Sequence, residues 1–148
     1  MNPLDFDVTT AAHAIQLALA PVFLLTGVGA LLNVMTNRLG RVIDRARFLE
    51  QLWHKLDDKA QTSTRKELRI LARRARLANW AINLSACAAL LICAVVATLF
   101  VDVFIATNLK WLAGTFFFAA TLALIGGLVS FLREVYLATH TTRIGPPQ

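Results

Sequence analysis

Three long stretches without a charged residue constrain the fold of this 148-residue chain more than any other feature. They cover residues 8–37, 77–101 and 111–132. Each offers the ~20 residues that an α-helix needs to cross the hydrocarbon core of a bilayer. The mean hydropathy of +0.59 and the hydrophobic fraction of 57% also exceed those of a typical soluble domain. The sequence therefore predicts an all-α membrane protein with three transmembrane helices. They are expected at residues 12–34, 79–101 and 111–132.

The first of these stretches differs from a cleaved secretory signal. Its N-terminal flank carries Asp5 and Asp7 where a signal peptide is basic, and its apolar run is longer than a signal requires. We therefore interpret this segment as a permanent transmembrane helix.

The basic residues are concentrated in one connection, and this predicts the orientation. Twelve of the fifteen Lys and Arg residues lie between Arg38 and Arg76. The positive-inside rule places such a connection in the cytoplasm. The N-terminal segment 1–11 and the loop 102–110 then lie outside, whereas the tail 133–148 lies in the cytoplasm. The predicted topology is N-out, C-in.

The cytoplasmic region 35–78 is expected to form an antiparallel helical hairpin, because its apolar residues follow a heptad pattern. The outgoing seam consists of Met35, Leu39, Val42, Ala46, Leu49, Trp53 and Leu56. The returning seam consists of Leu68, Leu71, Ala75, Ala78 and Ile82. The polar residues 57–64 are expected to form the turn, and Thr64 with Glu67 matches a capping box that begins the second helix. The first two transmembrane helices thus extend into the hairpin.

A second apolar strip on the hairpin predicts self-association. Ile43, Phe48 and Leu52 lie off the main seam, and a two-helix hairpin of this size buries little apolar area by itself. We expect another subunit to cover this strip, so the predicted assembly is a homo-oligomer.

A polar stripe runs along the first helix. Its members recur every three or four residues, which keeps them on one side of the helix. They are Thr26, Ala30, Asn33, Asn37, Arg41 and Asp44. An amide that faces lipid is costly, so the asparagines should face another helix or a wetted space. Asn79 and Asn83 form a similar pair in the second helix. Either these groups only fix helix packing, or they line a pore. The pore-lining candidates are Thr26, Ala30, Asn33, Asn37, Asn79 and Asn83.

Acidic residues mark the predicted outer face. Asp5, Asp7 and Asp102 map there, with Lys110 and the N-terminal amine opposing them. In a symmetric oligomer they would form a negative rim that concentrates cations. The alternative is ordinary solvation of helix ends, with Asp102 terminating a span.

Arginines lie where the helices leave the bilayer, so anionic lipids are expected partners. The candidate headgroup ligands are Arg38, Arg41, Arg45, Arg47 and Arg133. Asp44 can neutralise Arg41, Arg45 or Arg47 within one helix. Glu134, at the end of the third helix, is expected to pair with an arginine of the hairpin.

A weak metal site is suggested by Glu50, His54 and Asp58, which recur every four residues along one expected helix face. Inorganic cations are therefore candidate ligands. Lys55 and Lys59 oppose this interpretation, and a solvated charged face explains the same pattern.

No sequence motif of a catalytic or cofactor site is present, so no enzyme activity and no cofactor are expected. Cys87 and Cys93 fall on nearly opposite sides of the second helix, which excludes a disulfide and favours a packing role. The net charge of +6 is explained by topology, and no nucleic-acid recognition motif accompanies it.

Three motifs occur in order along the chain: N-R-L-G-R-V-I-D-R-A-R, R-R-A-R-L-A-N-W-A-I-N-L-S and F-L-R-E-V-Y-L-A-T. With them the chain resembles a bacterial family of small three-span inner-membrane proteins of unknown function, from about Ala12 to Thr139. The resemblance implies a bacterial inner-membrane location, so the outer segments 1–11 and 102–110 would be periplasmic. It supplies no catalytic or binding residues.

The leading functional hypothesis is an oligomeric, cation-leaning ion channel with the first transmembrane helix near the pore axis. The alternative is a non-conducting scaffold or regulatory subunit that binds a partner through the hairpin. A secondary transporter is disfavoured because the sequence has no inverted repeats and few ionisable groups within its spans.

Overall fold

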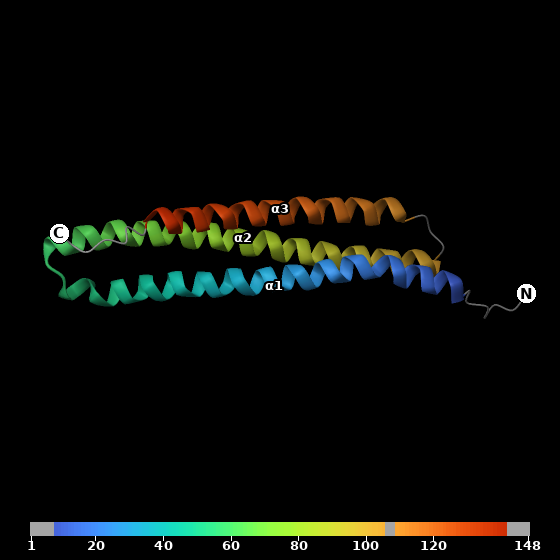
Figure 1. Cartoon of the computed structure of the whole chain (residues 1–148), viewed down its shortest axis with the longest axis horizontal. Coiled ribbons are helices and arrows are strands. Elements are labelled where there is room, and N and C mark those ends of the chain that lie inside the picture. The colour runs from blue at the N-terminus through green and yellow to red at the C-terminus, as the bar shows by residue number, and fades with distance from the viewer. Residues whose placement is uncertain (1–7, 106–108, 142–148) are drawn as a thin grey trace, which may run out of the picture. The chain divides into compact units, whose positions relative to one another are not determined.

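The computed structural model describes residues 8–105 and 109–141 and consists of long helices (Figure 1). Helix α1 covers Val8–Leu52, a short 3-10 helix η1 covers Trp53–Lys55, α2 covers Asp58–Ile105 and α3 covers Lys110–Thr141. Within these ranges there is no strand. Helices α1, α2 and α3 are long and apolar enough to cross a membrane. The predicted all-α class and the three candidate membrane helices are therefore confirmed.

Helices α1 and α2 are longer than a membrane crossing requires. They contain 45 and 48 residues, which corresponds to roughly 70 Å of helix each, about twice the hydrocarbon thickness of a bilayer. Their basic residues all lie between Arg38 and Arg76, in the second half of α1 and the first half of α2. Each helix thus joins an apolar half to a polar half.

The connection between α1 and α2 is shorter and earlier than the sequence predicts. Helix α1 ends at Leu52, and α2 already begins at Asp58, whose carboxylate suits the positive end of the helix dipole. Leu56 is extended, with φ −95° and ψ 142°. The side chain of Gln61 donates a hydrogen bond to the carbonyl oxygen of Leu56 at 3.0 Å, which satisfies a backbone group that the turn leaves free. The predicted turn at 57–64 is therefore wrong.

The predicted capping box is also wrong. Thr64 is buried inside α2, and its Oγ1 donates to the carbonyl oxygen of Ala60 at 2.8 Å. A hydroxyl that bonds back to the preceding turn serves the helix interior and does not begin a helix.

The described residues fall into two compact units. Unit 1 combines residues 8–31, 84–105 and 109–125, and unit 2 combines residues 32–83 and 126–141. In unit 2, the buried cluster of Val42, Leu49 and Leu71 joins α1 to α2. The half-buried residues packed against this cluster are Ala46, Leu68 and Ala75. These are members of the two predicted heptad seams.

The burial pattern follows a period of seven, as expected for coiled-coil packing. In unit 2 the buried positions at this spacing are Met35, Val42 and Leu49 in α1, Thr64, Leu71 and Ala78 in α2, and Gly127 and Glu134 in α3. The seam members Trp53 and Leu56 lie beyond the end of α1, so the predicted outgoing seam stops at Leu49.

Unit 1 buries small side chains. Ala18, Ser85, Ala88, Ala113 and Ala120 are all buried, and small residues let helices approach closely where lipid provides no hydrophobic driving force. Val28, Ile92 and Val95 are also buried in this unit. Many other large apolar residues of the unit are exposed, as expected for a lipid-facing surface. Examples are Phe23, Leu90 and Phe118.

Several predicted segments lie outside the described residues, wholly or in part. Asp5 and Asp7 are among them, together with part of the loop 102–110 and the end of the tail 133–148.

Candidate functional site

A buried carboxylate lies at the centre of the polar contacts of unit 2. Glu134, on α3, is 1% exposed. Its Oε1 accepts hydrogen bonds from Nε and Nη2 of Arg74, on α2, at 3.1 and 2.9 Å. Two hydrogen bonds between charged groups are among the stronger polar contacts that a protein makes.

A second arginine approaches the same carboxylate from α1. Nε of Arg38 lies 3.3 Å from Oε2 of Glu134. This distance is within ion-pair range, but Oε2 accepts no hydrogen bond, so the contact is one of charge rather than of aligned donor and acceptor. The guanidinium of Arg38 also lies over the ring of Phe131, 5.5 Å from the ring centre, which adds a cation–π contact. Residues 131 and 134 lie one helical turn apart on α3, so a single helix face holds Arg38.

Burial of Glu134 requires this pairing. An unpaired carboxylate in a low-dielectric interior is strongly unfavourable, whereas two guanidinium groups offset much of its desolvation. The sequence-based prediction that Glu134 pairs with an arginine of the hairpin is confirmed. Arg74 was not singled out by the sequence, and its selection among the basic residues of α2 required the helix packing. The sequence signal for Glu134 is its position as a carboxylate at the end of an apolar helix, where it needs a cation.

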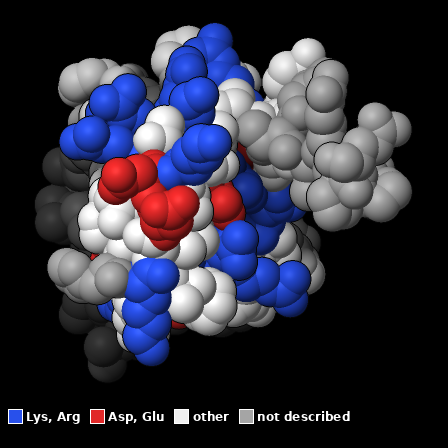
Figure 2. All heavy atoms as spheres, turned by 90° about the vertical axis from the view of Figure 1, so that its left-hand side faces the viewer, with Lys and Arg blue, Asp and Glu red and all other residues white. Residues whose placement is uncertain are grey.

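An arginine cleft adjoins this network in unit 2. It has a volume of about 370 Å³ and is lined by Arg38, Arg41, Val42, Arg45, Leu71 and Arg74. Nη2 of Arg45 lies 3.0 Å from Oε1 of Glu67, so Arg45 pairs across to α2 rather than along its own helix with Asp44. Figure 2, which faces the end where α1 joins α2, shows Lys and Arg side chains around much of this end and fewer carboxylates. We refer to the cavity lined by these four arginines, Val42 and Leu71 as the arginine cleft.

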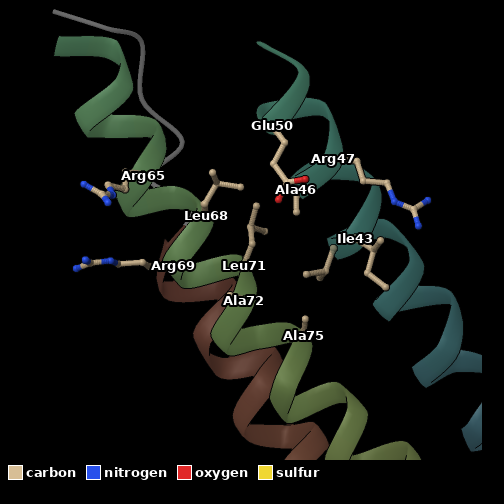
Figure 3. Close-up of a pocket in the computed structure, with 11 residues that line it drawn as sticks. Ile43, Ala46, Arg47, Glu50, Arg65, Leu68, Arg69, Leu71, Ala72 and Ala75 are labelled. Carbon is tan, nitrogen blue, oxygen red and sulfur yellow. The ribbon is translucent and has the colours of Figure 1, made fainter. Parts of the chain in front are cut away.

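A larger apolar groove lies between α1 and α2 in the same unit (Figure 3). Its volume is about 590 Å³. Leu68 and Leu71 point into it from α2, whereas the guanidinium groups of Arg65 and Arg69 point away (Figure 3). Of the second apolar strip predicted from the sequence, Ile43 and Phe48 are exposed and Leu52 is half-buried. Within the described part of the chain, the groove and the side chains of Ile43 and Phe48 are therefore left open.

All six pore-lining candidates are exposed in the single chain: Thr26, Ala30, Asn33, Asn37, Asn79 and Asn83. Nδ2 of Asn37 donates to Oδ1 of Asn33 at 3.3 Å within α1. Oγ1 of Thr26 donates to the carbonyl oxygen of Val22 at 3.3 Å. These contacts are local to α1, and both asparagines are exposed.

Asp102 serves the connection between α2 and α3. Its Oδ1 accepts a hydrogen bond from the backbone N–H of Leu109 at 2.9 Å. The carbonyl oxygen of Leu109 in turn accepts from the N–H groups of Leu112 and Ala113 at 2.9 and 3.2 Å. Asp102 therefore positions the residue from which α3 begins. Helix α2 itself continues to Ile105.

The suggested metal site loses its geometric premise. Glu50 belongs to α1, whereas Asp58 is the first residue of α2, so the spacing of four does not follow one helix face. The side chain of His54 lies outside the described part of the chain. The described residues contain no group of three His, Cys, Asp or Glu side chains suited to a metal ion. Cys87 and Cys93 are free and exposed.

A family model described as "protein of unknown function (DUF2721)" matches residues 18–144. The chain belongs to this family. The DUF2721 match includes Glu134 and every arginine of the cleft. No curated protein and no solved structure matches this DUF2721 protein.

Proposed function

We propose that this protein is an oligomeric channel of the bacterial inner membrane that favours cations, with α1 nearest the pore axis. The observation that carries the proposal is the exposed polar stripe on α1. Thr26, Asn33 and Asn37 are all exposed within the charge-free stretch 8–37. Amides facing lipid are unfavourable, and neighbouring copies of α1 would supply either partners or water.

The proposed orientation is N-out, C-in, with the polar halves of α1 and α2 forming a cytoplasmic hairpin. The concentration of basic residues between Arg38 and Arg76 supports it. Exposed aromatic residues on α3 agree with a bilayer crossing. Trp111 is 71% and Tyr136 64% exposed. The helix between them is about 37 Å long, which suits aromatic anchors in the two interfacial regions.

Preference for cations follows from the groups near the proposed path. Asparagine oxygens can replace part of a cation's hydration shell. Asp102 lies near the outer end of α2, and in a ring of subunits its carboxylate would raise the local cation concentration.

Potassium flux from liposomes that contain the purified protein tests this function. Asn33→Leu and Asn37→Leu should each reduce the flux, because they remove the polar groups of the stripe. Val34→Leu is the matched control, since Val34 is a neighbouring exposed residue of α1 and stays apolar. Absence of flux at every voltage and pH, or equal flux in the Asn33→Leu, Asn37→Leu and Val34→Leu proteins, would contradict the proposal.

The alternative function is a non-conducting scaffold or regulatory subunit. The uncovered apolar groove between α1 and α2 favours it, because an amphipathic helix of a partner can bind in such a groove. This alternative predicts that liposomes hold their potassium gradient with the unsubstituted protein as well as with the Asn33→Leu protein.

A further inference from the structure

We propose that the arginine cleft is a binding site for a phosphoryl anion, supplied either by the headgroup of an anionic phospholipid or by inorganic phosphate. The proposal stands on the contacts of unit 2 and is independent of ion conduction.

The cleft is built from two helices. Arg38, Arg41 and Arg45 are spaced by three and four residues and therefore lie on one side of α1. Arg74 faces them from α2, and Val42 and Leu71, both buried, form the apolar part of the lining. The volume of about 370 Å³ holds a phosphoryl group together with several waters, since one water occupies about 30 Å³ in the liquid.

The charge of the cleft is unbalanced. Four arginines line it, and two carboxylates pair with them, Glu134 with Arg38 and Arg74 and Glu67 with Arg45. Two of the four positive charges are therefore uncompensated by these pairs. Arg41 makes no ion pair within residues 8–105 and 109–141. Like charges three or four residues apart on a helix destabilise it, so an anion that bridges them would relieve this repulsion.

Three of the four guanidinium groups are already held in place. Arg74 is fixed by Glu134, Arg38 by Glu134 and Phe131, and Arg45 by Glu67 together with the ring of Phe48, 5.8 Å away. An arginine carries five N–H donors, and these contacts leave donors free on each group. Prearranged donors reduce the entropy lost when a ligand binds. The planar fork of arginine also matches two phosphoryl oxygens at once.

The position of the cleft in the chain favours a phospholipid as the source. Arg38 follows the charge-free stretch 8–37 directly, and Arg74 precedes the charge-free stretch 77–101 by three residues. In a helix that crosses the bilayer, such positions lie at the depth of the headgroup phosphates. Of the five arginines that the sequence predicts to bind headgroups, only Arg38, Arg41 and Arg45 line the cleft. Arg47 lines the apolar groove instead, and Arg133 is exposed on α3.

Binding is tested on the full chain purified in a neutral detergent, with two probes. Native mass spectrometry measures the affinity for added phosphatidylglycerol against phosphatidylcholine. Thermal unfolding measures stabilisation by inorganic phosphate against chloride at equal ionic strength. Arg41→Gln removes the arginine without an ion pair, and Arg41→Lys keeps its charge but loses the fork. Arg73→Gln is the matched control, because Arg73 is an exposed neighbour of Arg74 that does not line the cleft.

We expect Arg41→Gln to weaken binding about tenfold, the effect of losing roughly one charge-assisted hydrogen-bonded pair. The affinity of the Arg41→Lys protein should lie between those of the Arg41→Gln protein and the unsubstituted protein. The Arg73→Gln protein should bind with unchanged affinity. Selective retention of phosphatidylglycerol assigns the site to lipid, whereas stabilisation by phosphate without lipid selectivity assigns it to the free anion; both support the site. Equal weakening by Arg41→Gln and Arg73→Gln, or no response to either probe, overturns it.

Discussion

Arg74 of α2 places Nη2 2.9 Å from Oε1 of Glu134 in α3, a contact between residues 60 positions apart in the sequence. Because Arg38 of α1 approaches the same carboxylate, one buried side chain of α3 contacts both α1 and α2 within unit 2. The carboxylate also ties Arg38 and Arg74 to fixed positions at the arginine cleft. Helix packing and the proposed anion site therefore depend on the same residue.

Replacing Glu134 should destabilise the protein. Glu134→Gln leaves two guanidinium groups without their anion, but both are partly exposed, at 36% and 20% of their side chains, so water recovers part of the loss. We expect a cost of about 2 kcal/mol, below the ~3–5 kcal/mol for a fully buried pair. Thermal unfolding in detergent measures it. Arg133→Gln, at the adjacent exposed position, is the control, and an equal shift in both proteins would argue against the network.

Removing apolar volume from the cluster between α1 and α2 should lower the free energy of unfolding by more than Glu134→Gln does. Leu71 is 6% exposed and packs with Val42 and Leu49, so Leu71→Ala should lower the free energy of unfolding by about 2–4 kcal/mol. Ile70 is 37% exposed, and Ile70→Ala should cost under about 1 kcal/mol. Chemical unfolding of the Leu71→Ala and Ile70→Ala proteins under the same conditions measures both free-energy changes. A larger loss from Ile70→Ala would mean that the packed face of α2 is not the one described.

The sequence predicted the helices better than the turn. Long charge-free stretches and seven-residue spacing depend on many residues, so the seams through Val42 and Leu71 emerged correctly. The turn depends on few residues. The polar stretch 57–64 was assigned to it by composition, but Asp58 and Gln61 close the connection earlier, and the hydroxyl of Thr64 bonds within α2.

The polar contacts were predictable in kind but not in partner. A carboxylate at the end of an apolar helix needs a cation, and the pairing of Glu134 followed from that requirement. The choice of Arg74 and Arg38 depends on which residues face α3, which the sequence does not contain as a local signal. For the same reason the sequence left open which of Arg41, Arg45 and Arg47 Asp44 neutralises, whereas Arg45 pairs with Glu67, 22 residues away.

The pair of Arg45 and Glu67 should contribute little to stability. Their side chains are 51% and 44% exposed, so water screens the attraction, and the coupling energy should lie below about 1 kcal/mol. A double-mutant cycle with Arg45→Ala and Glu67→Ala measures it by thermal unfolding. A coupling well above this value would indicate a less hydrated environment, such as one covered by a second subunit.

The contact between Asp102 and Leu109 gives the means to separate two roles of one carboxylate. Asp102→Ala removes the acceptor for the Leu109 N–H and should destabilise the protein by roughly 1 kcal/mol. Asp102→Asn removes the negative charge but keeps an acceptor oxygen. Its destabilisation should therefore be less than half of that caused by Asp102→Ala. If Asp102 belongs to a cation-concentrating rim, Asp102→Asn should lower potassium flux from liposomes although unfolding is nearly unchanged. If its role is confined to the start of α3, flux should follow stability, and only Asp102→Ala should reduce both.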